Sequence, residues 1–148
     1  MTLIDTVLKL AATLPLKDAA FEIWRHKGDF DREELPSPPF VDLSDPEVAA
    51  KHMREFEARY LFERTNAHDG ATFERVKRVH PKANDADVKA AIKAAVKLDD
   101  DCVKYFDRDH TDFVQAIDTA LTQATRDNPG YLERTYRSAG AFLLYCFK

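Results

Sequence analysis

The sequence predicts an all-α protein, a compact bundle of six or seven helices. Apolar residues recur at intervals of three and four through most of the chain, which is the spacing of amphipathic helices. Only 4 glycines occur in 148 residues, and no stretch alternates apolar and polar residues for the length of a strand. The composition, 45% hydrophobic and 32% charged, is typical of a folded protein and excludes a disordered one. We therefore expect residues 1–148 to form a single helical domain around one core.

Two short helices are predicted at the start of the chain. Thr2 and Asp5 have the spacing of a capping box, and apolar residues at helical intervals follow them. Pro15 ends or kinks this first helix because proline lacks the backbone N–H that a helix interior needs. A second helix is expected over 17–27, and Gly28 lies where a glycine commonly ends a helix.

Residues 29–45 are predicted to form a proline-rich crossover. Pro36, Pro38 and Pro39 exclude a continuous helix and favour extended or polyproline-like backbone. The apolar residues of this segment are expected to hold it against the body of the protein. These residues are Phe40, Val41 and Leu43.

The first long helix is predicted to begin at Asp45 and Pro46, because proline is favoured at the first helical position. It is expected to end within 66–70. A shorter helix over 72–79 follows, and Pro81 ends it. The long helix carries an apolar stripe that we expect to face the core, formed by Ala49, Met53, Phe56 and Tyr60.

Another long helix is predicted from Asn84 or Asp85 to Phe106. Asp99 lies on its apolar face, and two interpretations are open. The helix breaks near Leu98 and the acidic run caps a new helix, or Asp99 is a buried carboxylate that requires a partner. We favour a break or an edge position.

The last two helices are separated by Asn128, Pro129 and Gly130, which predict a sharp turn. The final helix starts near Tyr131 and runs into the apolar stretch SAGAFLLYCF at 138–147. A helix that is apolar on every side must be surrounded, so we place it near the centre of the bundle. The small residues at 138–141 predict that another helix approaches closely there.

Three aromatic residues of this final helix are candidates for contact with a second chain. Tyr131 opens the helix, and tyrosine is favoured in protein interfaces. Tyr145 and Phe147 lie at the end of the chain, and chain ends are seldom deeply enclosed. The sequence therefore predicts a homodimer or another protein partner.

The segment around residues 107–112 is the strongest candidate for a metal site. Asp107 and His110 are three residues apart, and Asp112 follows, so carboxylates and an imidazole could meet on one cation. The alternative needs no metal: Asp109 or Thr111 caps a helix, and Asp112 in its first turn complements the helix dipole. We favour the capping interpretation and predict no cofactor.

Acid–base catalysis has weaker candidates. His52 has Glu55 one turn further along, as a catalytic imidazole held by a carboxylate would have, and Asp99 is a third candidate. A histidine at the edge of the core that finds a hydrogen bond would show the same pattern, and we favour that interpretation. A small metal-dependent or acid–base enzyme is thus the alternative function.

Charge and cysteine content bear on partners and location. Basic residues in 75–97 suggest weak nucleic-acid binding as a third function, but the net charge of −4 disfavours nucleic acid and anionic membranes. Cys102 and Cys146 lie among apolar residues, and we expect both to be buried and reduced, as in a cytoplasmic protein. No apolar run approaches the roughly 20 residues of a membrane span. A protein-interaction or self-associating module is therefore the predicted function.

Overall fold

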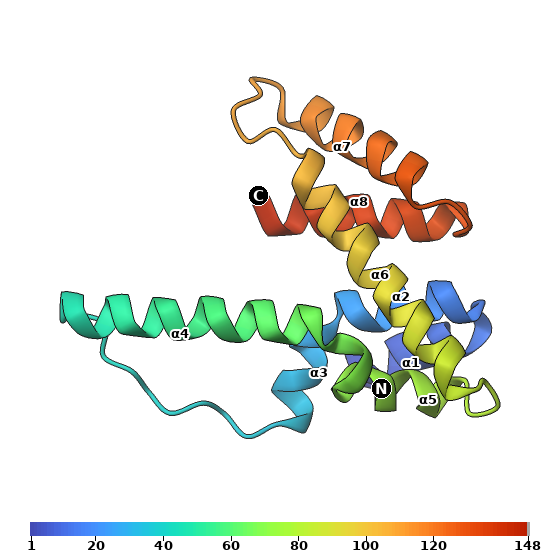
Figure 1. The fold of residues 1–148 in the computed structure, drawn as a ribbon, viewed down its shortest axis with the longest axis horizontal. Helices are drawn as coiled ribbons and strands as arrows, with labels where there is room; N and C mark the ends of the chain where they lie inside the picture. The colour runs from blue at the N-terminus through green and yellow to red at the C-terminus, as the bar shows by residue number, and fades with distance from the viewer. Residues whose placement is uncertain (148) are drawn as a thin grey trace.

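The computed structural model describes residues 1–147, and all regular secondary structure within them is helical (Figure 1). Eight α-helices and one short 3-10 helix occur in this range. The predicted all-α class is confirmed. The predicted count of six or seven is too low because part of the crossover is helical.

The first two helices form as predicted. α1 (Leu3–Thr13) begins with a complete capping box, in which the backbone N–H of Thr2 and that of Asp5 each donate to the other residue's side chain at 3.1 Å. α2 (Leu16–Arg25) starts directly after Pro15. Every residue of α2 from 18 to 24 is buried, so this short helix lies in the core rather than on the surface.

The crossover departs from the prediction at its start. The chain bends at His26 and continues as α3 (Lys27–Glu34), so only residues 35–45 are irregular. Gly28 does not adopt the positive φ of a helix-ending glycine, and it lies within the first turn of α3. The prediction that apolar residues hold the loop to the body is wrong, since Phe40 is 92% exposed and Leu43 is also exposed.

α4 (Pro46–Thr65) is capped by Asp45, whose carboxylate accepts a hydrogen bond from the N–H of Glu47 at 2.8 Å. Figure 1 shows α4 extending away from the other helices. None of its residues is buried, and Phe56 is 47% exposed. The expectation that its apolar stripe faces the core is therefore wrong. The spacing makes one face of the helix apolar, but no other described segment covers that face.

The 3-10 helix η1 (Ala67–Asp69) and α5 (Ala71–Val79) lead into α6 (Asp85–Tyr105). The side chain of Asn84 caps α6 by accepting a hydrogen bond from the N–H of Asp87. α6 is continuous through Asp99, so the favoured break near Leu98 is wrong and the alternative of a buried carboxylate is correct. α6 packs against α2, α5, α7 and α8.

The last two helices pack closely against each other. α7 (Phe113–Asp127) and α8 (Glu133–Phe147) meet at Gly140, where an added Cβ would lie 2.9 Å from a methyl group of Leu121. This confirms the predicted close approach. α8 buries only one face, which includes Ala139 and Leu143, while Tyr145 is exposed. The predicted central position of α8 is not confirmed, since the most extensive helix contact is between α2 and α6.

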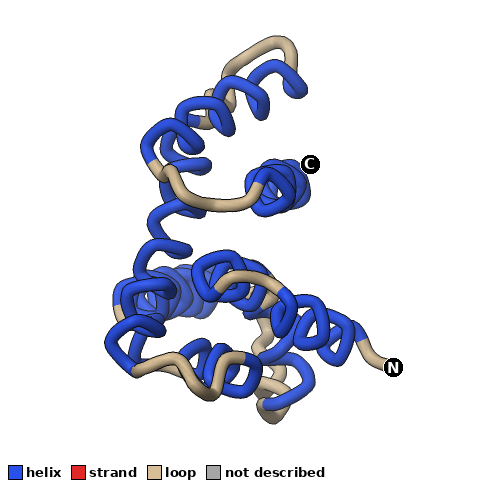
Figure 2. Tube along the Cα trace, turned by 90° about the vertical axis from the view of Figure 1, so that its right-hand side faces the viewer, coloured by secondary structure: helices blue, strands red, loops and turns tan. Residues whose placement is uncertain are grey.

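The helices form two groups that α6 connects. Figures 1 and 2 show α7 and α8 on one side and α1, α2 and α5 on the other. Asp18 of α2 links the groups, because its carboxylate accepts hydrogen bonds from the N–H of Leu132 at 2.8 Å and from the hydroxyl of Thr135 at 2.6 Å. None of the helices in residues 1–147 is long and apolar enough to cross a bilayer.

Candidate functional site at the base of the projecting helix

The last turn of α4 is attached to the body through Arg64. Its guanidinium donates to Asp99 at 2.8 Å and to Asp100 at 2.8 Å. Asp99 also accepts a hydrogen bond from the indole nitrogen of Trp24 at 3.0 Å. Burial alone would lower the pKa of Arg64, but the adjacent Asp99 and Asp100 raise it above its ordinary value. This polar cluster joins α2, α4 and α6.

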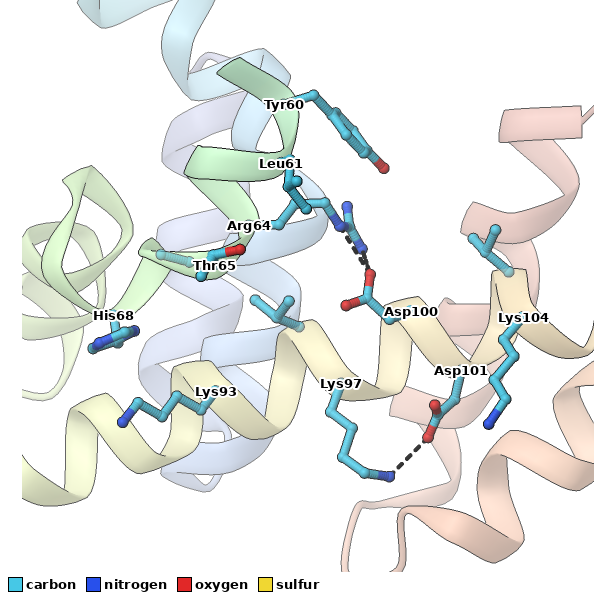
Figure 3. A pocket seen from close by; sticks show the side chains of 13 residues that line it. Tyr60, Leu61, Arg64, Thr65, His68, Lys93, Lys97, Asp100, Asp101 and Lys104 are labelled. Atoms are coloured by element: carbon cyan, nitrogen blue, oxygen red, sulfur yellow. Dashed lines mark hydrogen bonds and ion pairs between the residues drawn. The ribbon is translucent and has the colours of Figure 1, made fainter. Parts of the chain in front are cut away.

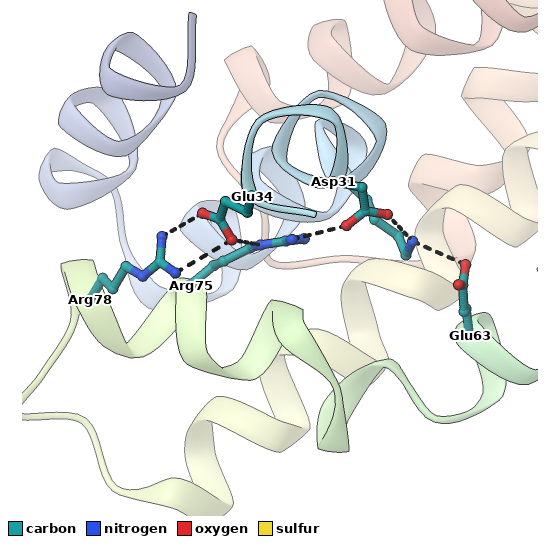
Figure 4. Close-up of polar contacts among 6 residues, drawn as sticks. Asp31, Glu34, Glu63, Arg75 and Arg78 are labelled. Atoms are coloured by element: carbon teal, nitrogen blue, oxygen red, sulfur yellow. Dashed lines mark hydrogen bonds and ion pairs between the residues drawn. The ribbon is translucent and has the colours of Figure 1, made fainter. Parts of the chain in front are cut away.

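A second attachment runs from α4 to α3 and α5 (Figure 4). Lys27 pairs with Glu63 at 3.0 Å and with Asp31 at 2.5 Å. Asp31 in turn pairs with Arg75 at 2.9 Å. The acidic segment after Gly28 thus neutralises basic residues within the same chain.

Arg75 is the most deeply buried cation of the described residues, with 1% of its surface exposed. It donates to Glu34 at 3.3 Å, and its guanidinium carbon lies 4.8 Å from the centre of the Phe30 ring. Arg78 pairs with the same Glu34 at 2.6 Å. These two arginines begin the basic segment 75–97 proposed to bind nucleic acid, and both are already engaged with carboxylates.

A cleft of about 710 Å³ lies between the end of α4 and the exposed side of α6 (Figure 3). Lys93, Lys97 and Lys104 line it from α6. Lys97 pairs with Asp101 at 2.7 Å. The ion pairs Arg64–Asp100 and Lys97–Asp101 therefore reduce the positive charge of the cleft.

A smaller cavity of about 340 Å³ also borders Arg64 and lies between α2, α4 and α8. We name it the aromatic cavity, since its lining includes the aromatic residues Trp24, Tyr60, Phe142 and Phe147. No pattern in the sequence predicted this cavity. Its aromatic residues come from three helices, and no spacing in the sequence relates them.

The proposed metal ligands lie in the connection between α6 and α7. Asp107 accepts a hydrogen bond from the N–H of Asp109 at 2.9 Å, and His110 accepts one from the N–H of Asp112 at 2.9 Å. Asp112 caps α7 by accepting from the N–H of Gln115 at 3.1 Å. The helix cap is therefore Asp112 rather than Asp109 or Thr111. Within residues 1–147, no three His, Cys, Asp or Glu side chains are grouped so that they could hold a metal ion.

The proposed catalytic residues are not brought together. His52 and Glu55 lie in the projecting part of α4, and Glu55 faces Lys51 at 3.9 Å. Asp99 instead contacts Arg64 at the end of α4. At a rise of 1.5 Å per residue, Arg64 lies about 18 Å along the axis of α4 from His52. These three side chains do not share a site.

The three interface candidates have different surroundings. Tyr131 is buried, and its ring meets that of Phe21 edge-on at 6.4 Å, so its assignment to an interface is wrong. Phe147 is half-buried and stacks on Phe106 with 4.7 Å between ring centres. Tyr145 is 77% exposed and accessible to a partner.

The apolar face of α4 was predicted to face the core but is exposed. An apolar stripe shows that one face of a helix is apolar, but it does not show whether the residues that cover this face belong to the same chain.

Comparisons with protein-family models, with curated proteins and with solved structures found no match to this chain.

Proposed function

We propose that this protein is a self-associating module in which α4 pairs with α4 of a second copy. The observation that carries the proposal is a helix of 20 residues with none buried and with a large apolar surface. Its exposed apolar residues are Val48, Met53, Phe56, Tyr60, Leu61 and Phe62. Each large apolar side chain that becomes fully buried contributes about 1.5–3 kcal/mol.

The spacing of the stripe supports pairing with an identical helix. Ala49, Met53, Phe56 and Tyr60 are separated by four, three and four residues, as in helices that pack along one seam. If two copies run antiparallel with Met53 opposite Phe56, Ala49 of each copy lies opposite Tyr60 of the other. Small and large side chains then alternate, and the contact is the same from both sides.

Charge also favours a second copy over a strongly charged partner. α4 carries four acidic residues and four basic residues, so the helix has no net charge apart from His52. Two such helices can approach without overall repulsion, and neither attracts a partner of one sign.

The stripe continues onto the body of the protein. Phe56 and Tyr60 stack with 6.3 Å between ring centres, and Tyr60 lines the aromatic cavity together with Cys146 of α8. A stable interface buries about 800 Å² per partner, which is more than one helix face supplies. We therefore propose that the exposed Tyr145, next to Cys146, adds to the edge of the contact.

Light scattering of the purified full chain at tens of micromolar tests the proposal. We expect a dimer mass for the natural protein and a monomer mass for Phe56→Lys, since removing a central anchor commonly costs about 2 kcal/mol or more. Val114→Lys is the matched control, because Val114 is a 73% exposed residue of α7. This variant should remain dimeric.

A monomer mass for the natural protein would refute the proposal, and so would a dimer of the Phe56→Lys variant. Tyr145→Lys should weaken the dimer less than Phe56→Lys. The reverse order would place the interface at the end of α8 and contradict pairing through α4.

A further inference from the structure

We propose that the aromatic cavity binds a small organic anion, a carboxylate attached to a planar apolar body. The cavity has a volume of about 340 Å³, which falls within the roughly 300–1,000 Å³ of small-molecule sites. This inference concerns a ligand inside one chain and does not rest on the pairing through α4, although Tyr60 belongs to both surfaces.

Arg25 supplies the first unused positive charge. Its guanidinium donates to the backbone oxygen of Ser138 at 3.2 Å and to the hydroxyl of the same residue. Its Nε is buried and has no hydrogen-bond partner among the described residues. The buried Nε is out of reach of a ligand, but Nη2 of the same guanidinium makes no hydrogen bond within residues 1–147 and is not buried.

Arg108 supplies the second unused charge. Its guanidinium carbon lies 4.7 Å from the centre of the Phe147 ring, and the side chain lines the cavity. Neither Arg25 nor Arg108 forms an ion pair with a carboxylate in residues 1–147. The two guanidinium groups are therefore available to an anion.

The acidic residues of the cavity do not oppose this. Glu63 and Asp99 are the acids that line it. Asp99 already accepts from Arg64 and Trp24, and Glu63 pairs with Lys27. The charge that remains unpaired is positive, which favours an anion over a cation.

The walls and the cations together indicate the chemical class. Aromatic side chains line the cavity, and Tyr60, which is 49% exposed, is more accessible to a planar apolar group than the buried Trp24. Guanidinium groups match the two oxygens of a carboxylate, because their N–H groups form a planar fork. A charged head and an apolar body thus satisfy both parts of the cavity.

Isothermal titration calorimetry of the full chain with naphthoate tests this inference. We expect saturable binding, which weakens by about tenfold or more in Arg108→Gln because a charge-assisted hydrogen bond is lost. Arg126→Gln is the matched control, since Arg126 is an exposed arginine of α7 that does not line the cavity. It should bind naphthoate as the natural protein does.

The neutral analogue naphthalenemethanol separates recognition of the charge from simple apolar binding. It should bind about tenfold more weakly or worse than naphthoate, because it lacks the anion. Equal binding of the two compounds would overturn the inference. No binding of naphthoate at millimolar concentration would do the same, as would equal losses in the Arg108 and Arg126 variants.

Cys146 provides a readout of position, because its side chain lines the cavity. Bound naphthoate should slow alkylation of Cys146 by iodoacetamide, a neutral reagent, in the natural protein but not in Arg108→Gln. Unchanged alkylation at saturating naphthoate would show that the compound binds elsewhere and would overturn the assignment to this cavity.

Discussion

Asp99 and Trp24 are joined by a hydrogen bond of 3.0 Å between helices α6 and α2, and both side chains are buried. The same carboxylate oxygen accepts from Arg64 at the base of α4. One buried oxygen therefore connects the two helices of the core to the helix that projects from it.

Asp99→Ala should strongly destabilise the fold. It leaves the indole N–H of Trp24 and the guanidinium of Arg64 without their buried acceptor, which costs about 3 kcal/mol. Asp100→Ala is the matched control, because Asp100 pairs with the same arginine but is half-exposed, and such pairs contribute about 1 kcal/mol or less. Urea unfolding followed by circular dichroism gives both free energies. Equal losses for the two variants would contradict the role of Asp99.

Arg75→Ala and Arg78→Ala should differ although both residues pair with Glu34. Arg75 is buried against Phe30, so its removal costs about 3 kcal/mol through lost packing and lost buried hydrogen bonds. Arg78 is half-exposed, and its removal should cost about 1 kcal/mol or less. Thermal and urea unfolding check the difference. Similar costs would show that burial does not decide the strength of these pairs.

Acid should weaken the contact between α3 and α5. The hydrogen bond from Arg78 lowers the pKa of Glu34 below its ordinary value of 4.5. Burial would raise the pKa of Asp31, but hydrogen bonds from Lys27 and Arg75 outweigh it and bring the pKa below 3.8. The folded state binds these protons less tightly than the unfolded state does. The two carboxylates therefore stabilise the fold at pH values above their ordinary pKa values, and this stabilisation is lost as the pH falls through the lower pKa values of the folded state.

Urea midpoints measured from neutral pH down to pH 3 should therefore fall most steeply below about pH 4.5. The double variant Asp31→Asn, Glu34→Gln should start with a lower midpoint at neutral pH and show a shallower decline. An equally steep decline in this variant would assign the acid sensitivity to other carboxylates.

The two cysteines should react at different rates. Burial, together with the charges of Asp99 and Asp101, raises the pKa of Cys102 to about 12, so its reactive thiolate is scarce at neutral pH. Cys146 is exposed, which corrects the expectation that both thiols are buried, although partial burial also raises its pKa. Iodoacetamide should label only Cys146 in the folded protein and both cysteines in urea. Rapid labelling of Cys102 in the folded protein would contradict the structure.

The features that sequence predicted correctly depend on neighbours in the chain. Thr2, Asp45 and Asn84 cap helices by accepting hydrogen bonds from residues two or three positions ahead. Prolines and local spacing supply the remaining boundaries. Such interactions are visible in a short window of sequence, and they were sufficient to establish the helical class.

The features that sequence could not provide depend on distant residues. Asp99 is held by Trp24 and Arg64, which are 75 and 35 residues away. An acidic residue on an apolar helix face therefore suggested a break, although it had a partner. The aromatic cavity combines side chains from α2, α4 and α8, and only the packing of these helices brings them together.

Since α4 is attached to the body of the protein at one end, a small tilt at that end moves the other end by a large distance. Its 20 residues span about 30 Å, so a tilt of about 10° at Arg64 would displace the far end by about 5 Å. The guanidinium of Arg64 lies 5.4 Å from the ring of Trp24, which is the single tryptophan of the chain. A tilt of α4 about Arg64 would therefore change the surroundings of this indole, and the fluorescence of Trp24 would report the tilt.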